Sequence, residues 1–221
     1  ISGSGFYYPQ GIAADSNGNV YGGQISTRGI KKILDSTKNA DPNWAQRGTY
    51  FGSGQCRAYY LYSMEVHGDY LYAVSYYGHS VFRVHTTTGV CDYSERVRYA
   101  YNLAIGNNKL YAFGRWRNYT TWNLSGAKPS KINCSLSVYL WLYYESGSAV
   151  DPSGNYYYAA YSRNLYRHKI DNNGCITNSY SVATLNSTYF NRAAIRFHPT
   201  NDNILYAASM FRHRLTKITL D

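Results

Sequence analysis

Acidic side chains are scarce in this chain of 221 residues. Aspartate and glutamate together number 12, and charged residues of both signs make up only 15% of the sequence. Many hydrolytic enzymes rely on paired carboxylates or on a cluster of metal ligands. The sequence has no Cys-x-x-Cys pair, and its histidines show no spacing typical of a zinc site. We therefore expect no enzyme activity, no cofactor and no metal ion.

One catalytic alternative remains open, because Glu65 interrupts a repeated pattern. The other copies of the repeat described below carry alanine at this place, at Ala13, Ala104, Ala149 and Ala194. With Glu145, Glu65 could form the acid–base pair of a glycosidase. The structural alternative is that Glu65 pairs with an arginine or histidine near the centre of the fold. Asp15 and Asp151 are most simply turn formers.

Long apolar runs are also missing. No stretch reaches the roughly 18 apolar residues that a membrane-spanning helix needs, so we expect no membrane span. The first residues, ISGSGFYY, lack the basic start and the apolar core of a signal peptide. If the protein is secreted, we expect this sequence to be the mature form.

Tyrosine is abundant, with 27 residues against 7 phenylalanines, and it marks a repeat. The stretch YPQGIAADSNGNVYGGQISTRGIKKI reads as three short strands, with a tight turn at DSNGN. Similar stretches follow, so that the repeats begin near Tyr8, Tyr60, Tyr99, Tyr144 and Tyr189. A second tyrosine recurs in each middle strand, always followed by Gly or Ala, at Tyr21, Tyr72, Tyr111, Tyr158 and Tyr206.

Five repeats of about 45 residues, each with several short strands, are typical of propeller blades. We predict an all-β fold: a five-bladed β-propeller of four-stranded blades in a single domain over residues 1–221. Residues 1–6 would pair beside 214–220 and close the last blade, which removes two open sheet edges. In the third unit we expect a turn over 125–134 and an outer strand within 136–144.

Four cysteines and four Asn-x-Ser/Thr sequons, at Asn118, Asn123, Asn133 and Asn186, favour a secreted, extracellular glycoprotein. Asn118 and Asn186 are expected in loops and are the preferred glycosylation sites. Cys91, Cys134 and Cys175 each appear just after a third strand, and equivalent places on neighbouring blades should be too far apart for a disulfide. The pairing therefore stays open, with partly buried free thiols as the alternative.

The surplus of ten positive charges favours an acidic partner. In a four-stranded blade, the loop before the first strand and the loop between the second and third strands open on one face. Here these loops combine aromatic rings, which stack on sugars, with arginines, which bind acidic groups. The candidate ligand-binding residues are Arg28, Tyr76, Tyr77, His79, Arg115, Trp116, Arg117, Arg163, Arg192, Phe211, Arg212 and His213. The five tyrosines that open the repeats are better explained by packing between blades, because exact recurrence suits a structural repeat.

Part of the chain resembles known families. PQGIAADSNGNVYGG, with its third strand after STRG, resembles an NHL-type repeat, which implies a propeller. NADPNWAQRGTYFGSGQ looks like the repeat of tachylectin-like five-bladed lectins. Some NHL-type propellers bind RNA on a basic face, so the resemblance also implies nucleic acid as a third candidate partner.

Our first functional hypothesis is a secreted, lectin-like module that binds acidic glycans or polysaccharides. The second is a structural or adhesive subunit of an extracellular glycoprotein assembly, in which tyrosine-rich faces meet other copies. The third is nucleic-acid binding, against which glycosylated sequons would argue.

Overall fold

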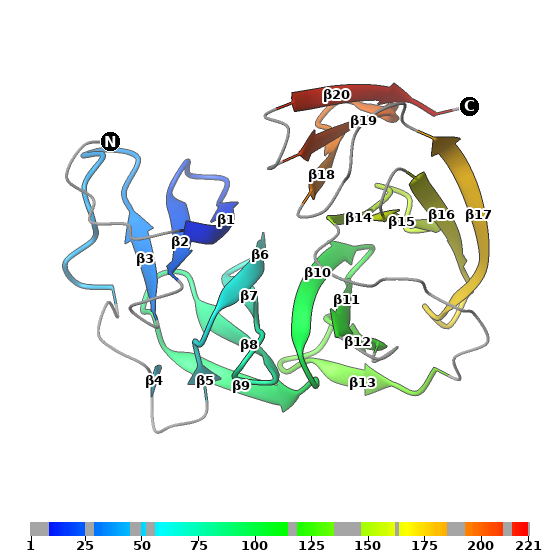
Figure 1. The fold of residues 1–221 in the computed structure, drawn as a ribbon. Helices are drawn as coiled ribbons and strands as arrows, with labels where there is room; N and C mark the ends of the chain where they lie inside the picture. The colour runs from blue at the N-terminus through cyan, green and yellow to red at the C-terminus, as the bar shows by residue number, and fades with distance from the viewer. Residues whose placement is uncertain are drawn as a thin grey trace. The chain divides into compact units, whose positions relative to one another are not determined.

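The computed structural model describes residues 9–24, 29–44, 50–51, 56–114, 119–134, 147–161, 164–184, 193–209 and 214–220. In these ranges every regular element is a β-strand, and no helix there is long and apolar enough to span a membrane. The described strands form six antiparallel sheets (Figure 1), and five of these are the blades of a β-propeller. The predicted fold class is thus confirmed.

Three blades have four described strands and two have three. The first blade is β1 (Pro9–Ala14), β2 (Val20–Gln24) and β3 (Ile30–Ile33), and it is followed by a two-stranded sheet of β4 (Tyr50–Phe51) and β5 (Cys56–Arg57). The second blade is β6 (Leu61–His67), β7 (Tyr70–Ser75), β8 (Ser80–His85) and β9 (Cys91–Arg96).

The third blade is β10 (Ala100–Gly106), β11 (Lys109–Gly114), β12 (Tyr119–Asn123) and β13 (Ser130–Ile132). The fourth is β14 (Ser148–Val150), β15 (Tyr156–Tyr161), β16 (Asn164–Ile170) and β17 (Ile176–Thr184). The fifth is β18 (Ala193–His198), β19 (Asn201–Ser209) and β20 (Arg214–Thr219). Neighbouring strands in each blade follow one another in sequence, as in a meander.

The chain divides into two compact units, residues 1–103 and 104–221. In the first unit, β1 and β2 pack against β6, and the core contains Tyr21, Trp44 and Phe82. Gly23 allows this close approach, because a Cβ atom there would lie 2.7 Å from the Cβ of Leu61. In the second unit, apolar clusters lie between the third and fourth blades and between the fourth and fifth.

The aspartates at the first hairpin turns are turn formers, as predicted. Asp15 Oδ1 accepts hydrogen bonds from the backbone N–H groups of Asn17 and Asn19, at 3.0 and 2.9 Å. Asp151 Oδ1 accepts one from the N–H of Tyr156 at 2.7 Å. These bonds satisfy donors that the tight turn leaves without a ladder partner, which explains why Asp recurs at this place.

Several boundaries were predicted well, and one was wrong. Strands β1, β6 and β10 begin directly after the tyrosines that open the first three repeats. In the third blade the fourth strand is β13, within residues 125–134 that were expected to form only a turn. Residues 135–146, which hold most of the expected outer strand, lie outside the described ranges, as do residues 1–8 with the expected closing strand.

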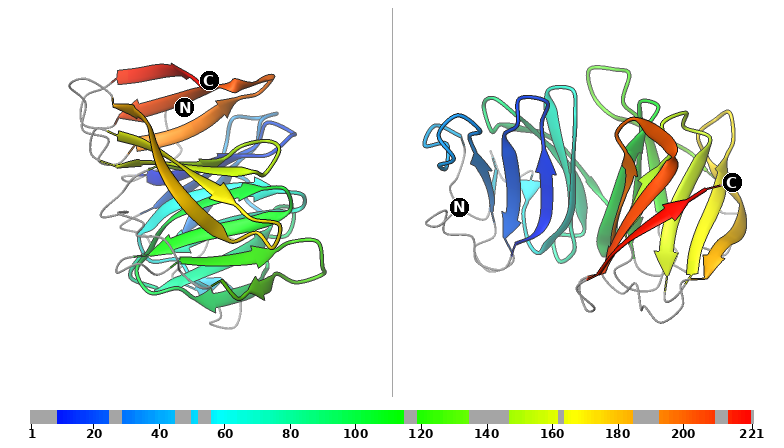
Figure 2. Two further views of the ribbon diagram at one scale, coloured as in Figure 1. Left: turned by 90° about the vertical axis from the view of Figure 1, so that its right-hand side faces the viewer. Right: turned by 90° about the horizontal axis from the view of Figure 1, so that it is seen from above.

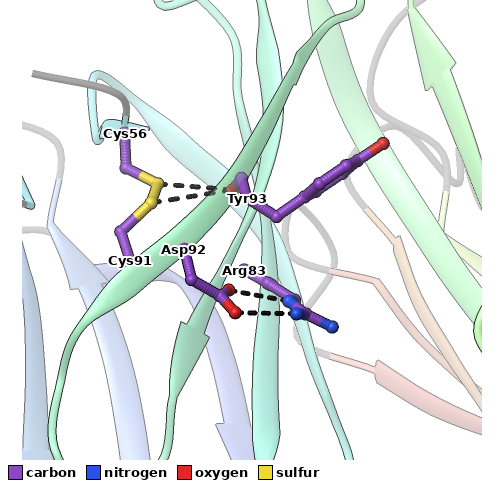
Figure 3. Close-up of a disulfide and its surroundings, with 5 residues drawn as sticks. All are labelled: Cys56, Arg83, Cys91, Asp92 and Tyr93. Carbon is purple, nitrogen blue, oxygen red and sulfur yellow. Dashed lines mark hydrogen bonds and ion pairs between the residues drawn. A yellow bond between two sulfur atoms is a disulfide. The ribbon is translucent and has the colours of Figure 1, made fainter. Parts of the chain in front are cut away.

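Two disulfides each link the chain segment that follows one blade to the next blade. Cys56 in β5 bonds to Cys91, which begins the outer strand of the second blade (Figure 3). Cys134 follows β13 and bonds to Cys175, in the turn before β17, with the Cα atoms 5.5 Å apart. No cysteine is free, which answers the open question of free thiols. The expected separation was wrong because Cys134 follows the fourth strand of its blade, not the third.

Candidate functional site

Loops of the second and third repeats, together with Tyr62 of β6, bring seven rings into one cluster within the first unit. We call it the tyrosine cluster; it consists of Tyr59, Tyr60, Tyr62, Tyr76, Tyr77, His79 and Tyr99. Tyr59 and Tyr60 precede β6, the Tyr76–His79 segment joins β7 to β8, and Tyr99 precedes β10. The expectation that these two kinds of loop meet on one face is confirmed for this blade.

The rings of the cluster are in mutual contact, mostly edge to face. Ring centres lie 4.8 Å apart for Tyr60 and Tyr77, 4.9 Å for Tyr76 and Tyr77, and 5.4 Å for Tyr76 and Tyr99. The His79 imidazole lies 4.3 Å from the Tyr99 ring. Such pairs add about 0.5–1.5 kcal/mol each beyond the area they bury. The cluster is therefore a connected aromatic surface.

Backbone hydrogen bonds and one buried serine hold the two tyrosine loops together. The N–H groups of Tyr76 and Tyr77 donate to the carbonyls of Tyr60 and Tyr59, at 3.1 and 3.3 Å. Ser75, fully buried at the end of β7, accepts a hydrogen bond from the N–H of Tyr59 and donates to its carbonyl, both at 2.9 Å. Its hydroxyl thus ties the loop before β6 to the loop after β7.

Three members of the cluster have left-handed backbone conformations. The φ angles are 59° at Tyr60, 52° at His79 and 53° at Tyr99. Bulky side chains rarely adopt this region, at a cost of about 1–3 kcal/mol each, unless surrounding contacts hold them there. Such strain concentrates at binding and catalytic sites, so its presence three times in one surface cluster marks this place as a candidate site.

His79 connects the cluster to the third repeat. Its Nδ1 accepts a hydrogen bond from the N–H of Tyr99 at 3.0 Å, so the neutral imidazole carries its proton on Nε2. Its carbonyl accepts from the N–H of Val97 at 2.9 Å. Burial, followed by the positive charges of Arg96 and Arg98, lowers the pKa of His79 below the usual value of 6.5. The ring is therefore neutral at physiological pH.

Part of the cluster is open to a ligand. Tyr77 is 50% exposed, and the Arg98 guanidinium carbon lies 6.0 Å from the centre of the Tyr99 ring. An exposed aromatic surface next to a cation can stack on the apolar face of a sugar and bind an acidic group at the same time.

Of the twelve predicted ligand-binding residues, the structure brings together Tyr76, Tyr77 and His79. The other nine lie outside the described ranges: Arg28, Arg115, Trp116, Arg117, Arg163, Arg192, Phe211, Arg212 and His213. Tyr60 and Tyr99 were expected to serve mainly in packing between blades. They contact Tyr77 and His79, so they belong to the same surface as the predicted residues.

In four of the five repeats the second recurring tyrosine has a structural role that was not predicted from the sequence; the exception is Tyr111, which faces Thr121. Tyr21, Tyr72 and Tyr158 are at most 4% exposed, and their cross-strand partners are Lys32, Arg83 and Arg167. Tyr206 faces Lys217 in the same way. A cation nine or eleven residues after the tyrosine is the signal in the sequence. These cations belong to the blades and are not ligand-binding candidates.

The structure gives little support to a glycosidase pair of Glu65 and Glu145. Glu65 in β6 is partly buried opposite Tyr72, whereas Glu145 lies outside the described ranges. Ala13 and Ala149 also face the recurring tyrosine, but in the fifth blade Arg196, not Ala194, does so. Among the described residues, no group of three His, Cys, Asp or Glu side chains converges as metal ligands would.

No family model and no curated protein matches the sequence. Solved structures do match. A protein from Lactobacillus plantarum is 14% identical over 97% of this chain and 71% of that chain, with a TM-score of 0.64. Hydrazine synthase from Kuenenia stuttgartiensis is 13% identical over 100% of this chain and 70% of that one, with a TM-score of 0.60. A chain of the mitotic checkpoint complex is 11% identical over 95% of this chain and 62% of that one, with a TM-score of 0.64. At these identities the likeness concerns the fold alone.

Proposed function

We propose that this protein is a secreted, lectin-like module that binds acidic carbohydrate at the tyrosine cluster, without a catalytic step. The observation that carries the proposal is the set of strained, interlocked loops that present Tyr77 half exposed in the same cluster as Tyr99, whose ring centre lies 6.0 Å from the Arg98 guanidinium carbon. Stacking on the ring would bind the apolar face of a sugar, and the cations would bind its acidic group.

The resemblances found in the sequence are consistent with this function. A pattern like the repeat of five-bladed tachylectin-like lectins occurs between residues 39 and 55, and an NHL-like pattern occurs in the first blade. Both kinds of repeat form propellers, so the fold suits either. We place carbohydrate first because the described cluster combines aromatic rings with few acidic groups.

Two exposed tyrosines allow a matched test, since Tyr77 in the cluster and Tyr180 in β17 are each 50% exposed. We expect Tyr77→Ala to weaken binding to polygalacturonate or heparin about tenfold, because stacking contributes roughly 1 kcal/mol or more. Tyr77→Phe should retain most of the affinity, and Tyr180→Ala should leave it unchanged. Affinities from isothermal titration calorimetry decide the matter. Equal losses in Tyr77→Ala and Tyr180→Ala would contradict the proposal.

Self-association into an extracellular assembly is the second candidate, and one observation favours it. The nine-residue strand β17 runs along the outside of its sheet and pairs, among the described strands, only with β16 (Figure 2). Its residues 178–181 are exposed. An outer strand of this length could pair with a strand of another copy. Sedimentation of the wild type and of a Tyr180→Lys variant would test this function.

Secretion is supported by the two disulfides, which are compatible with an extracellular protein. Asn133 is exposed just after β13, whereas Asn123 ends β12 and its Oδ1 accepts hydrogen bonds from Ser125. Asn118 and Asn186 lie outside the described ranges. Peptide mass spectrometry of native material should find glycan at Asn118, Asn186 or Asn133. Four unmodified asparagines would favour the nucleic-acid hypothesis instead.

A further inference from the structure

Two arginines stand on either side of a buried valine next to the tyrosine cluster. Val97 is only 3% exposed, and its N–H donates to the carbonyl of His79 at 2.9 Å. Arg96 ends β9, Arg98 follows Val97, and both are exposed. The bond from Val97 thus anchors the two cations beside His79. Arg98 belongs to a loop that was expected on the binding face, but neither arginine is among the twelve predicted ligand-binding residues.

The acidic groups of the same strand are already engaged. Asp92 binds Arg83 through two hydrogen bonds of 2.7 Å, and Glu95 accepts one from the Tyr93 hydroxyl at 2.6 Å. Among the residues that the structure describes, no carboxylate forms an ion pair with Arg96 or Arg98. The two guanidinium groups are therefore available to an anion from outside the protein.

We propose that Arg96 and Arg98, together with His79, form an anion subsite of the tyrosine cluster that binds the carboxylate or sulfate group of an acidic sugar. The subsite rests on the proposed carbohydrate function and extends it with residues and a ligand group. Guanidinium groups bind carboxylate and sulfate oxygens through paired hydrogen bonds. Since Nδ1 of His79 is occupied by the Tyr99 N–H, Nε2 supplies a further donor.

The pKa of His79 should also depend on whether an anion occupies the subsite. The groups that face it are the Tyr76 loop, the Tyr99 ring, Arg96 from β9 and Arg98 from the segment before β10. The two arginines disfavour its protonation, so an anion bound between them should cancel part of that effect and raise the pKa of His79. By reciprocity, the anion should bind more tightly as the pH falls through the pKa of His79.

The experiment uses sodium glucuronate and sodium sulfate as probes, with glucose and sodium chloride at matched ionic strength as controls. NMR titration of His79 is compared in the wild type, in the Arg96→Gln/Arg98→Gln variant and in a matched Lys169→Gln/Lys217→Gln variant, whose lysines are exposed in the second unit. We expect a probe to raise the pKa of His79 in the wild type and the lysine variant only.

Calorimetry with polygalacturonate and heparin should show at least a tenfold loss of affinity in the arginine variant alone. Polygalacturonate carries carboxylates alone and heparin carries both carboxylates and sulfates, so binding of heparin without binding of polygalacturonate would indicate that the subsite requires sulfate.

The outcomes separate the subsite from the function. Unchanged polysaccharide affinity in the arginine variant would overturn the subsite and leave the carbohydrate function standing. A rise in the His79 pKa with a probe, but no binding of any polysaccharide, would support the subsite and contradict the function. If neither probe affects His79 and no polysaccharide binds, both are wrong.

Discussion

Arg83 and Asp92 form a two-point ion pair across β8 and β9. Nε and Nη2 of the arginine each donate to one carboxylate oxygen of Asp92 at 2.7 Å (Figure 3). The arginine side chain is 3% exposed, and its guanidinium carbon lies 3.9 Å from the centre of the Tyr70 ring. A buried positive charge is thus paired with the Asp92 carboxylate and covered by an aromatic ring.

Asp92→Asn should lower the free energy of unfolding by about 3 kcal/mol, because it removes the carboxylate that pairs with the buried guanidinium charge. Adding Arg83→Met removes that charge, so the double variant should be more stable than Asp92→Asn alone. Lys38→Gln, which breaks an exposed ion pair with Asp35, should cost less than about 0.5 kcal/mol. Urea unfolding measures all three. If the losses of stability from Asp92→Asn and Arg83→Met simply add in the double variant, this explanation of the ion pair is wrong.

Removal of the Cys134–Cys175 disulfide by two alanine substitutions should lower the free energy of unfolding by about 2–4 kcal/mol. The bond closes a loop between residues 41 apart and so restricts the unfolded chain. The Cys56–Cys91 bond, with a separation of 35, should contribute a similar amount. Thermal unfolding with and without reductant tests this prediction. A variant without any cysteine is the control. If reductant lowers its melting temperature as well, the effect of reductant on stability is not due to the disulfides.

His168 should make the protein sensitive to mild acid. It is 3% exposed, neither ring nitrogen has a hydrogen-bond partner among the described residues, and burial lowers its pKa to about 4. Because the unfolded value is about 6.5, the stabilising effect is complete above that pH and is lost as pH falls toward 4. At pH 5 the loss is about 2 kcal/mol.

His168→Phe should remove this loss, so that the difference in stability between pH 7.5 and pH 5 becomes smaller than in the wild type. Urea unfolding at the two pH values gives the comparison. NMR titration of the wild type is the second measurement, in case the variant does not fold. A pKa of His168 near 6.5 would show that this residue has no part in acid sensitivity.

The turn between β10 and β11 should be sensitive to β-branched residues at Asn108. Asn107 and Asn108 have φ angles of 48° and 52°, as in a two-residue type I′ turn. Asn108→Val should cost about 1–2 kcal/mol, whereas Asn108→Gly should be neutral or slightly stabilising. The control is Asn172→Val, because Asn172 is a turn residue whose φ angle is not positive. A similar loss for both valine variants in thermal unfolding would contradict the turn assignment.

Blade boundaries were predictable from the sequence because they depend on local chemistry. Turns such as DSNGN need residues that tolerate positive φ or bond their own backbone, and Asp15 does so in the structure. Alternating apolar positions on either side set the first two strands of a blade. Accordingly β1, β2 and β3 lie where the opening stretch predicted them.

The outer strands and the disulfides were less predictable, because they depend on partners in other repeats. The short strand β13 carries no apolar pattern of its own; it is a strand because Thr121 and Trp122 of β12 pair with it. Its position then places Cys134 beside Cys175, which counting residues between repeats did not indicate.

The sequence by itself determined the class of fold, the number of repeats and the three cluster members Tyr76, Tyr77 and His79, because repeated turns and alternating strands are local properties. Only the tertiary structure decided that Tyr60 and Tyr99 join them and that Arg96 and Arg98 lie beside His79. Those contacts arise from hydrogen bonds between loops about 20 residues apart, such as the one from Tyr99 to His79. Such bonds form only when neighbouring strands have paired, so the sequence could place these loops on one face but could not specify which residues are in contact.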